Sequence, residues 1–285
     1  MRLTRLLTAV VSAIVLLAGT ATATAATLGY VALGDSYTSG PFIPVQSLDP
    51  LGCGRSNANY PSVLARKLQV PLTDVSCAGA DTSNMTASQS VPFSGTNQPQ
   101  FSALKVNTGL VTVGIGGNDF GVFGGLVGTC PGLRASNPTG SPCQDHFTAG
   151  GVDTVKAAIA GITPRVAAVL AGIHQRAPGA AVYVIGYPRI APETGYCPNI
   201  LPFADGDYAW LNSVEEALNA ALADAAAGGG ASFVDTFGPS RGHDACARGG
   251  AAWINGKDTK LFAAAAYHPL KAGMAGVADV IAAHL

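Results

Sequence analysis

The sequence carries little charge. Only 12% of its 285 residues are Asp, Glu, Lys or Arg, and the formal net charge is −1 at pH 7. A protein that binds nucleic acid needs a concentrated basic surface to neutralise phosphates. This chain has no excess of positive charge, so we expect no nucleic-acid partner.

Common metal-binding and phosphate-binding motifs are missing as well. None of the six cysteines lies in a Cys-x-x-Cys pair or at zinc-finger spacing. Gly116-Gly117 is not followed by the Gly-Lys-Ser/Thr of a phosphate loop, and it opens no Gly-x-Gly-x-x-Gly helix. We therefore expect neither a metal ion nor an organic cofactor.

The start of the chain has the pattern of a secretory signal peptide. Two arginines precede an apolar run at 6–18, and small residues at 23–25 suit cleavage. A membrane anchor is the alternative, but the run is short for a span and no basic stop-transfer segment follows. We predict a signal peptide at 1–25, one mature domain at 26–285 and a secreted, extracellular protein.

An exported chain with an even number of dispersed cysteines typically forms disulfides. Six cysteines permit 15 pairings, and their spacing does not choose among them. We therefore predict three disulfides of undetermined pairing among Cys53, Cys77, Cys130, Cys143, Cys197 and Cys246.

Apolar runs of strand length alternate with segments of helical spacing. The predicted strands are 28–33, 72–76, 109–114, 180–186 and 232–235, and the predicted helices are 60–68, 152–177, 204–227 and 269–283. Continuous apolar strands are typical of a sheet covered on both faces. The alternation predicts an α/β fold with a parallel sheet between two helical layers. Segments rich in Gly, Pro and Ser are expected to be loops: 41–57, 88–100, 121–148 and 188–202.

The first predicted strand ends abruptly at Gly34-Asp35-Ser36. Open α/β sheets build their sites at the carboxyl ends of the strands, so Ser36 is a candidate nucleophile. The alternative is that Ser36 only caps the following helix. We expect Asp35 to bond local backbone N–H groups rather than to take part in chemistry.

Two further turns supply candidate oxyanion donors. Asn118 follows the predicted strand 109–114, and its amide is a donor that can point at developing negative charge. Gly79 follows the predicted strand 72–76 and can present its N–H to a substrate. The alternatives are that Asn118 only closes its turn, as we expect for its neighbour Asp119, and that Gly79 is a plain turn glycine.

A histidine near the end of the chain is the candidate base. His268 stands directly before Pro269, and a neutral imidazole can take a proton from a serine and return it to a leaving group. Four other histidines compete. The strongest rival is His243, which we interpret as a loop residue beside Cys246.

Together these turns resemble the GDSL lipase/esterase family, the SGNH hydrolases. The matching blocks occur in the family's order and span nearly all of the mature chain: Gly34-Asp35-Ser36-Tyr37, Gly79, Gly116-Gly117-Asn118-Asp119 and His268-Pro269. The resemblance implies a three-layer α/β/α fold with a five-stranded parallel sheet of flavodoxin-like order. It also implies Ser36 as nucleophile, His268 as base, and an oxyanion hole made by the Ser36 and Gly79 N–H groups and the Asn118 side chain.

The chain is also similar to the secreted, six-cysteine branch of that family, which contains lipases, esterases and phospholipases. The similarity lies in the stretch from Phe233-Val234-Asp235 through Gly242-His243-Asp244-Ala245-Cys246 to Trp253-Ile254. That branch pairs successive cysteines, which here implies Cys53–Cys77, Cys130–Cys143 and Cys197–Cys246.

One position departs from the family pattern. Many members carry Asp three residues before the histidine, where this chain has Ala265, and no carboxylate lies in 261–267. A backbone carbonyl can also accept the Nδ1 proton of a histidine. We therefore predict a Ser36–His268 dyad oriented by the carbonyl of Ala265 or Ala266, as in some members of this branch. Asp235 and Asp258 are the distant alternatives.

The predicted activity is hydrolysis of carboxylic acyl esters, on a small-molecule or lipid substrate. Phospholipase A and polysaccharide deacetylation are alternatives, and an inactive disulfide-linked binding domain is the rival from another class. Nothing demands more than a monomer, and transient contact with a lipid interface is compatible with the sequence. Loop residues that can line an acyl groove, or simply pack under the loops, are Phe42, Ile43, Phe93, Phe120, Phe123 and Leu126.

Overall fold

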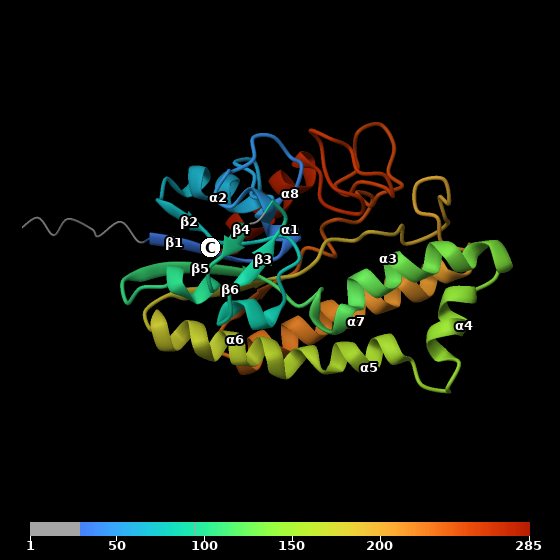
Figure 1. Ribbon diagram of the computed structural model, residues 1–285, viewed down its shortest axis with the longest axis horizontal. Coiled ribbons are helices and arrows are strands. Elements are labelled where there is room, and N and C mark those ends of the chain that lie inside the picture. The colour runs from blue at the N-terminus through green and yellow to red at the C-terminus, as the bar shows by residue number, and fades with distance from the viewer. Residues whose placement is uncertain (1–28, 94) are drawn as a thin grey trace, which may run out of the picture.

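The computed structural model describes residues 29–93 and 95–285 (Figure 1). The predicted signal peptide therefore lies outside the described residues. Five strands form one parallel sheet in the order β2-β1-β5-β6-β7. Their bounds are β1 Gly29–Gly34, β2 Leu72–Asp74, β5 Thr108–Gly114, β6 Ala181–Ile185 and β7 Ser232–Val234. This is the flavodoxin-like order, and it confirms the predicted α/β fold class.

Helices cover both faces of the sheet (Figure 1). One layer holds α2 (Tyr60–Leu68) and α8 (Lys271–Ala282), and the other holds α5 (Thr154–Ala160), α6 (Ile162–Arg176) and α7 (Asp207–Gly228). The predicted three-layer sandwich is therefore confirmed. A short helix, α1 (Ser36–Ser39), follows β1 directly.

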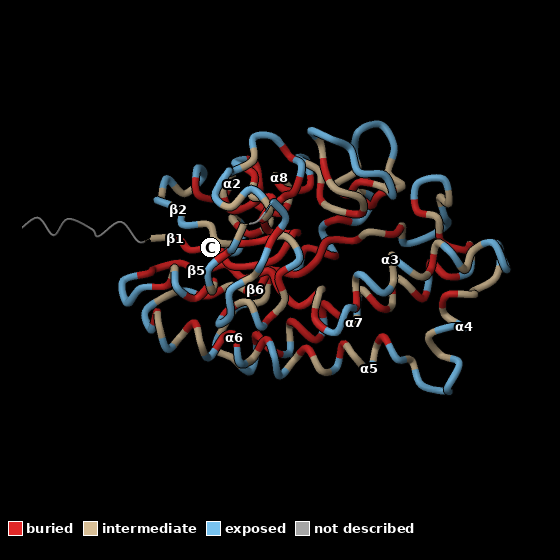
Figure 2. Tube along the Cα trace, in the orientation of Figure 1, coloured by how far each residue is buried: buried red, intermediate tan, exposed pale blue. Residues whose placement is uncertain are grey.

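The central strands bury side chains in both layers, which explains their unbroken apolar sequence. In β1, Tyr30 and Ala32 belong to the core beneath α2 and α8. The alternate residues, Val31 and Leu33, belong to the larger core beneath α6 and α7. Figure 2 shows these strands as a buried band through the centre of the molecule.

The predicted long helix at 152–177 is divided at Gly161 into α5 and α6. Taken together, Thr154–Arg176 is long and apolar enough to cross a membrane by length and composition. Within this fold its apolar residues instead face the core, where Val166, Leu170 and Ile173 are buried. A core helix of this kind passes the same test of length and composition.

Two segments expected to be loops contain regular structure. Residues 121–148 form α3 (Val122–Leu133) and α4 (Pro142–Thr148), which are joined by the Cys130–Cys143 disulfide. Residues 88–100 contain a small antiparallel hairpin of β3 (Gln89–Val91) and β4 (Gly95–Asn97). The glycine and proline content of these segments predicted loops, but tertiary packing and the disulfide override local propensity.

The register of the two central strands positions the site. Gly34 at the end of β1 pairs with Gly114 at the end of β5. Because the strands end level, the turns that follow them, which carry Ser36 and Asn118, lie at one edge of the sheet.

Candidate active site

Ser36 is the first residue of α1, and Asp35 caps that helix. The Asp35 carboxylate accepts a 2.9 Å hydrogen bond from the backbone N–H of Tyr37, so the capping role proposed as an alternative for Ser36 belongs to its neighbour. Gly34 precedes this turn with φ +154°, and a Cβ there would lie 2.6 Å from the Gly114 carbonyl oxygen. Glycine is therefore required where β1 turns into α1.

The structure brings Ser36 and His268 together. His268 Nε2 lies 2.8 Å from Ser36 Oγ, and His268 Nδ1 lies 2.6 Å from the Ala266 carbonyl oxygen. A carbonyl oxygen only accepts, so Nδ1 carries the proton and the bare Nε2 can accept the serine O–H. Burial lowers the pKa of His268 below its ordinary 6.5.

The Ala265 carbonyl, the other candidate orienting group, is used differently. It accepts a 2.9 Å hydrogen bond from Asn255 Nδ2. The backbone N–H of Asn255 also donates to the His268 carbonyl at 2.9 Å. Through these two hydrogen bonds the buried Asn255 holds the loop that carries the imidazole.

Tyr267 is held in a left-handed conformation beside the histidine. Its φ is +60°, which is uncommon for a residue with a side chain. The Tyr37 hydroxyl donates to the Tyr267 carbonyl at 2.6 Å, and the Tyr267 N–H donates to Gly256 at 2.9 Å. Sequence reasoning missed both Tyr37 and Asn255 as supports, although Tyr37 lies inside the first motif.

The distant carboxylates and the rival histidine lie in other contacts. Asp235 accepts from the N–H groups of Phe237 and Gly238, and Asp258 forms a 3.0 Å ion pair with Lys257. His243 stacks on Trp253 with ring centroids 4.8 Å apart, and its Nδ1 meets the Ala251 carbonyl oxygen. None of these contacts involves Ser36 or His268.

The candidate oxyanion donors come from three separate turns. One N–H of the Asn118 amide donates to the Ala80 carbonyl at 2.9 Å, which fixes the side chain and leaves its second N–H for a ligand. Gly79 adopts φ +76°, and within the described chain the Ser36 and Gly79 backbone N–H groups have no hydrogen-bond acceptor. The Cys53–Cys77 disulfide ties the loop after α1 to the Gly79 turn.

A buried network connects the nucleophile turn to the Asn118 turn. The Tyr187 hydroxyl donates to Asp35 Oδ2 at 2.5 Å and accepts from the Gly117 N–H at 2.9 Å. Asp35 is 1% exposed, and this burial raises its pKa to about 7. Asp119 similarly accepts from the Thr82 N–H at 3.0 Å. Sequence reasoning missed Tyr187. Its position just after β6, at the carboxyl end of a strand, could have indicated it.

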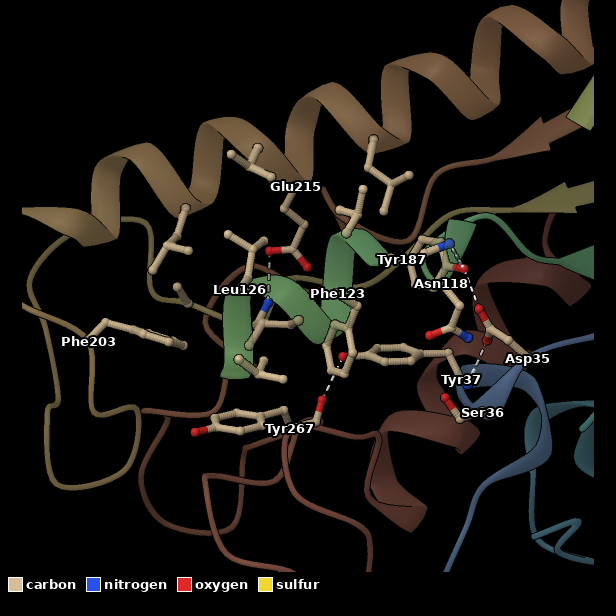
Figure 3. A pocket seen from close by; sticks show the side chains of 18 residues that line it. Asp35, Ser36, Tyr37, Asn118, Phe123, Leu126, Tyr187, Phe203, Glu215 and Tyr267 are labelled. Carbon is tan, nitrogen blue, oxygen red and sulfur yellow. Dashed lines mark hydrogen bonds between the residues drawn. The ribbon is translucent and has the colours of Figure 1, made fainter. Parts of the chain in front are cut away.

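An apolar cavity, partly open to solvent, begins at Ser36 and runs between α3 and α7 (Figure 3). Of the six apolar residues considered for an acyl groove, Phe123 and Leu126 line it. The others are elsewhere, as exposed loop side chains or in the core beneath α2 and α8: Phe42, Phe93, Phe120 and Ile43.

All six cysteines are paired, as Cys53–Cys77, Cys130–Cys143 and Cys197–Cys246. Among residues 29–93 and 95–285, no group of three or more His, Cys, Asp or Glu side chains is arranged to hold a metal ion.

Comparison with known proteins identifies the family of this chain. The model of the GDSL-like Lipase/Acylhydrolase family matches residues 32–275. Lipase 2 of Streptomyces coelicolor is 41% identical over 232 residues, which cover 80% of this chain and 76% of that protein. A crystal structure of phospholipase A1 from Streptomyces albidoflavus NA297 is 29% identical, covers 91% of this chain and all of its own, and superposes with a TM-score of 0.75. An extracellular lipase from Streptomyces rimosus has a TM-score of 0.74 at 28% identity, over 90% of this chain and all of its own. The chain belongs to the GDSL-like lipase/acylhydrolase family.

Proposed function

We propose that Ser36 and His268 form the catalytic dyad of this carboxylic ester hydrolase. The observation that carries the proposal is the 2.8 Å contact between Ser36 Oγ and an imidazole nitrogen that is free to accept a proton. The Ala266 carbonyl takes the orienting role that an aspartate has in a triad. Its oxygen lies 2.6 Å from His268 Nδ1 and so keeps the proton on that nitrogen.

The proposed reaction is acyl transfer through a covalent intermediate. Ser36 Oγ attacks the ester carbonyl while His268 Nε2 takes its proton. The oxyanion is stabilised by the Ser36 and Gly79 N–H groups and by Asn118, each worth about 3–4 kcal/mol in such sites. The alcohol departs with the proton from His268, and a water molecule activated by the same imidazole releases the acid.

The lowered pKa of His268 bears on the working pH. The base must be neutral, so kcat/KM falls as the pH drops through the His268 pKa, which lies below 6.5. The desolvation that lowers this pKa keeps the base available in mildly acidic solution.

The substrate we propose is an ester with an apolar acyl group, as in a lipid. The largely apolar lining of the cavity supports this class, as do relatives named lipase and phospholipase A1. A polysaccharide deacetylase needs an open polar cleft instead. Secretion is supported by the three disulfides and by similarity to an extracellular lipase, and we propose a monomer that meets lipid surfaces transiently.

The test compares Ser36→Ala and His268→Ala with Asp235→Asn and Asp258→Asn on short-chain, long-chain and phospholipid esters. We expect the first pair to lose about 10⁴-fold or more in kcat. The aspartate variants retain wild-type rates. If either aspartate variant is as impaired as His268→Ala, the dyad is wrong. If a phosphonate leaves Ser36 of the folded protein unmodified, the chain is instead an inactive binding domain.

A further inference from the structure

One carboxyl group lies in the wall of the acyl cavity. Glu215 projects from α7 into the space between α7 and α3, at the level of Phe123 and Leu126 (Figure 3). Its neighbours on the same helix face, Val214 and Leu218, are apolar and line the same cavity. An ionisable side chain in an apolar wall costs free energy unless its polar atoms are hydrogen-bonded or paired.

The hydrogen bonds of Glu215 are incomplete. Its Oε2 accepts a 3.1 Å hydrogen bond from the Ile190 N–H. Its Oε1 is buried and has no hydrogen-bond partner among the described residues. A buried polar atom left unpaired costs about 1–3 kcal/mol. If the only role of Glu215 were to hold Ile190, one oxygen would be stranded at this cost.

Among the described residues no cation forms an ion pair with Glu215, and the charge of Arg189 lowers its pKa by less than burial raises it. The nearby Arg189 directs Nη1 to Asn212 Oδ1 at 2.8 Å and stacks over the Phe237 ring at 3.8 Å. Burial raises the pKa of Glu215 to about 8, so at neutral pH the group is mostly a carboxylic acid, which can donate as well as accept.

We propose that Glu215 is a specificity-determining residue that selects acyl groups carrying a hydroxyl along the chain. The apolar wall binds the methylenes, and the Glu215 carboxyl hydrogen-bonds the hydroxyl at one depth of the cavity. A site that hydrogen-bonds a substrate hydroxyl discriminates strongly against the analogue that lacks it, because its own polar group is then left unpaired. This inference rests on the proposed hydrolase function and names its preferred acyl class.

The test is a set of ω-hydroxyacyl esters of increasing length, each paired with the unsubstituted acyl ester of the same length and alcohol. Each longer acyl chain places its terminal hydroxyl deeper in the cavity. One member of the series should therefore bring the hydroxyl level with Glu215, whatever the depth of that residue. In the wild type we expect the ratio of kcat/KM, hydroxylated over plain, to peak at one length by about tenfold or more.

Variants at position 215 identify the source of that peak. Glu215→Leu removes it and improves the plain esters, whereas Glu215→Gln retains it because an amide also donates and accepts. Glu216→Gln is the matched control, since Glu216 is exposed on the same helix and lies outside the cavity lining. Melting temperatures establish that the variants fold.

A pH profile gives a second readout. Above about pH 8 the ionised Glu215 disfavours an apolar acyl chain, so the KM for plain esters rises in the wild type and stays flat in Glu215→Gln. Other titratable and charged groups surround Glu215: Arg189, Glu216, Tyr37, Asp35, Tyr187 and Tyr267. They are the same in the wild type and in Glu215→Gln, so a difference between the two pH profiles comes from Glu215.

The outcomes separate this inference from the function on which it rests. A wild-type ratio that is flat with length, in an enzyme that Ser36→Ala inactivates, overturns the role of Glu215 and leaves the hydrolase intact. A peak that persists in Glu215→Leu also overturns it. Hydrolysis of plain esters that is unaffected by Ser36→Ala overturns the proposed function itself.

Discussion

Two carboxyl groups reach the same cavity from different regions of the protein. Asp35 belongs to the catalytic end, by which we mean the turns that carry Ser36, Asn118 and His268. Both of its oxygens are hydrogen-bonded, to Tyr37 and to Tyr187. Glu215 belongs to the acyl wall, by which we mean the residues of α3 and α7 that line the cavity, and one of its oxygens has no hydrogen-bond partner in the described part of the chain.

The two regions are held together by different kinds of interaction. The catalytic end is held by hydrogen bonds that link turns far apart in the sequence, and the proposed acyl transfer requires such fixed positions. The acyl wall is held by apolar packing between helices, which tolerates changes of shape. Substitutions at the catalytic end should therefore lower kcat for every ester, and those in the acyl wall should change which ester is preferred.

Among variants that leave the proposed dyad intact, the largest effect should come from Asn118→Ala, which removes one proposed oxyanion donor. We expect kcat to fall about 10²–10³-fold for all acyl lengths, with little change in KM. Steady-state kinetics on short and long esters measure both constants. Asn84→Ala is the control, because the Asn84 side chain accepts a hydrogen bond from a nearby backbone N–H, that of Asp81. A loss confined to long esters would place Asn118 in the acyl wall.

An intermediate effect should come from Tyr187→Phe, which breaks the link between Asp35 and the Gly117 N–H. Leaving a buried polar group without its hydrogen bond costs about 1–3 kcal/mol, so we expect kcat to fall about 5–100-fold for all esters. Tyr208→Phe is a matched control. Its hydroxyl also accepts from a backbone N–H and donates to an oxygen, but away from Ser36. Equal kcat in the two variants would show that the Tyr187 link serves stability alone.

The smallest effect should come from Leu126→Trp in the acyl wall. The larger ring fills part of the cavity, and we expect kcat/KM for long acyl esters to fall about 5–10-fold while short esters are unaffected. The ratio of the two substrates measures this directly. Leu48→Trp, at an exposed loop position, serves as the control. An equal loss on short esters would contradict the division between the two regions.

The sheet and the catalytic end could be predicted because their signals are local. The strands are unbroken apolar runs, and each motif stands where a strand ends, so the topology brings the motifs to one edge. The choice between the Ala265 and Ala266 carbonyls could not be predicted. It depends on the left-handed Tyr267 and on hydrogen bonds from Asn255, which the local sequence does not encode.

The acyl wall was harder to predict because its order is tertiary. Helix α3 contains Gly124, Gly125, Gly128, Pro131 and Gly132, all poor helix formers, so its sequence indicates a loop. Its helical form depends on packing against the core and on the disulfide to α4. Glu215 did leave a signal that was overlooked, since it falls at helical spacing within the apolar series of α7.

The serine and histidine that meet at 2.8 Å are separated by 232 residues of chain. The histidine is held beside its partner by Asn255 and by a 3.2 Å hydrogen bond from the Ala265 N–H to the Pro41 carbonyl oxygen. The proposed dyad therefore exists only when the loop that carries His268 is docked on the segment that follows α1. We expect ester cleavage to report this docking, so a chain in which the loop is undocked should be inactive.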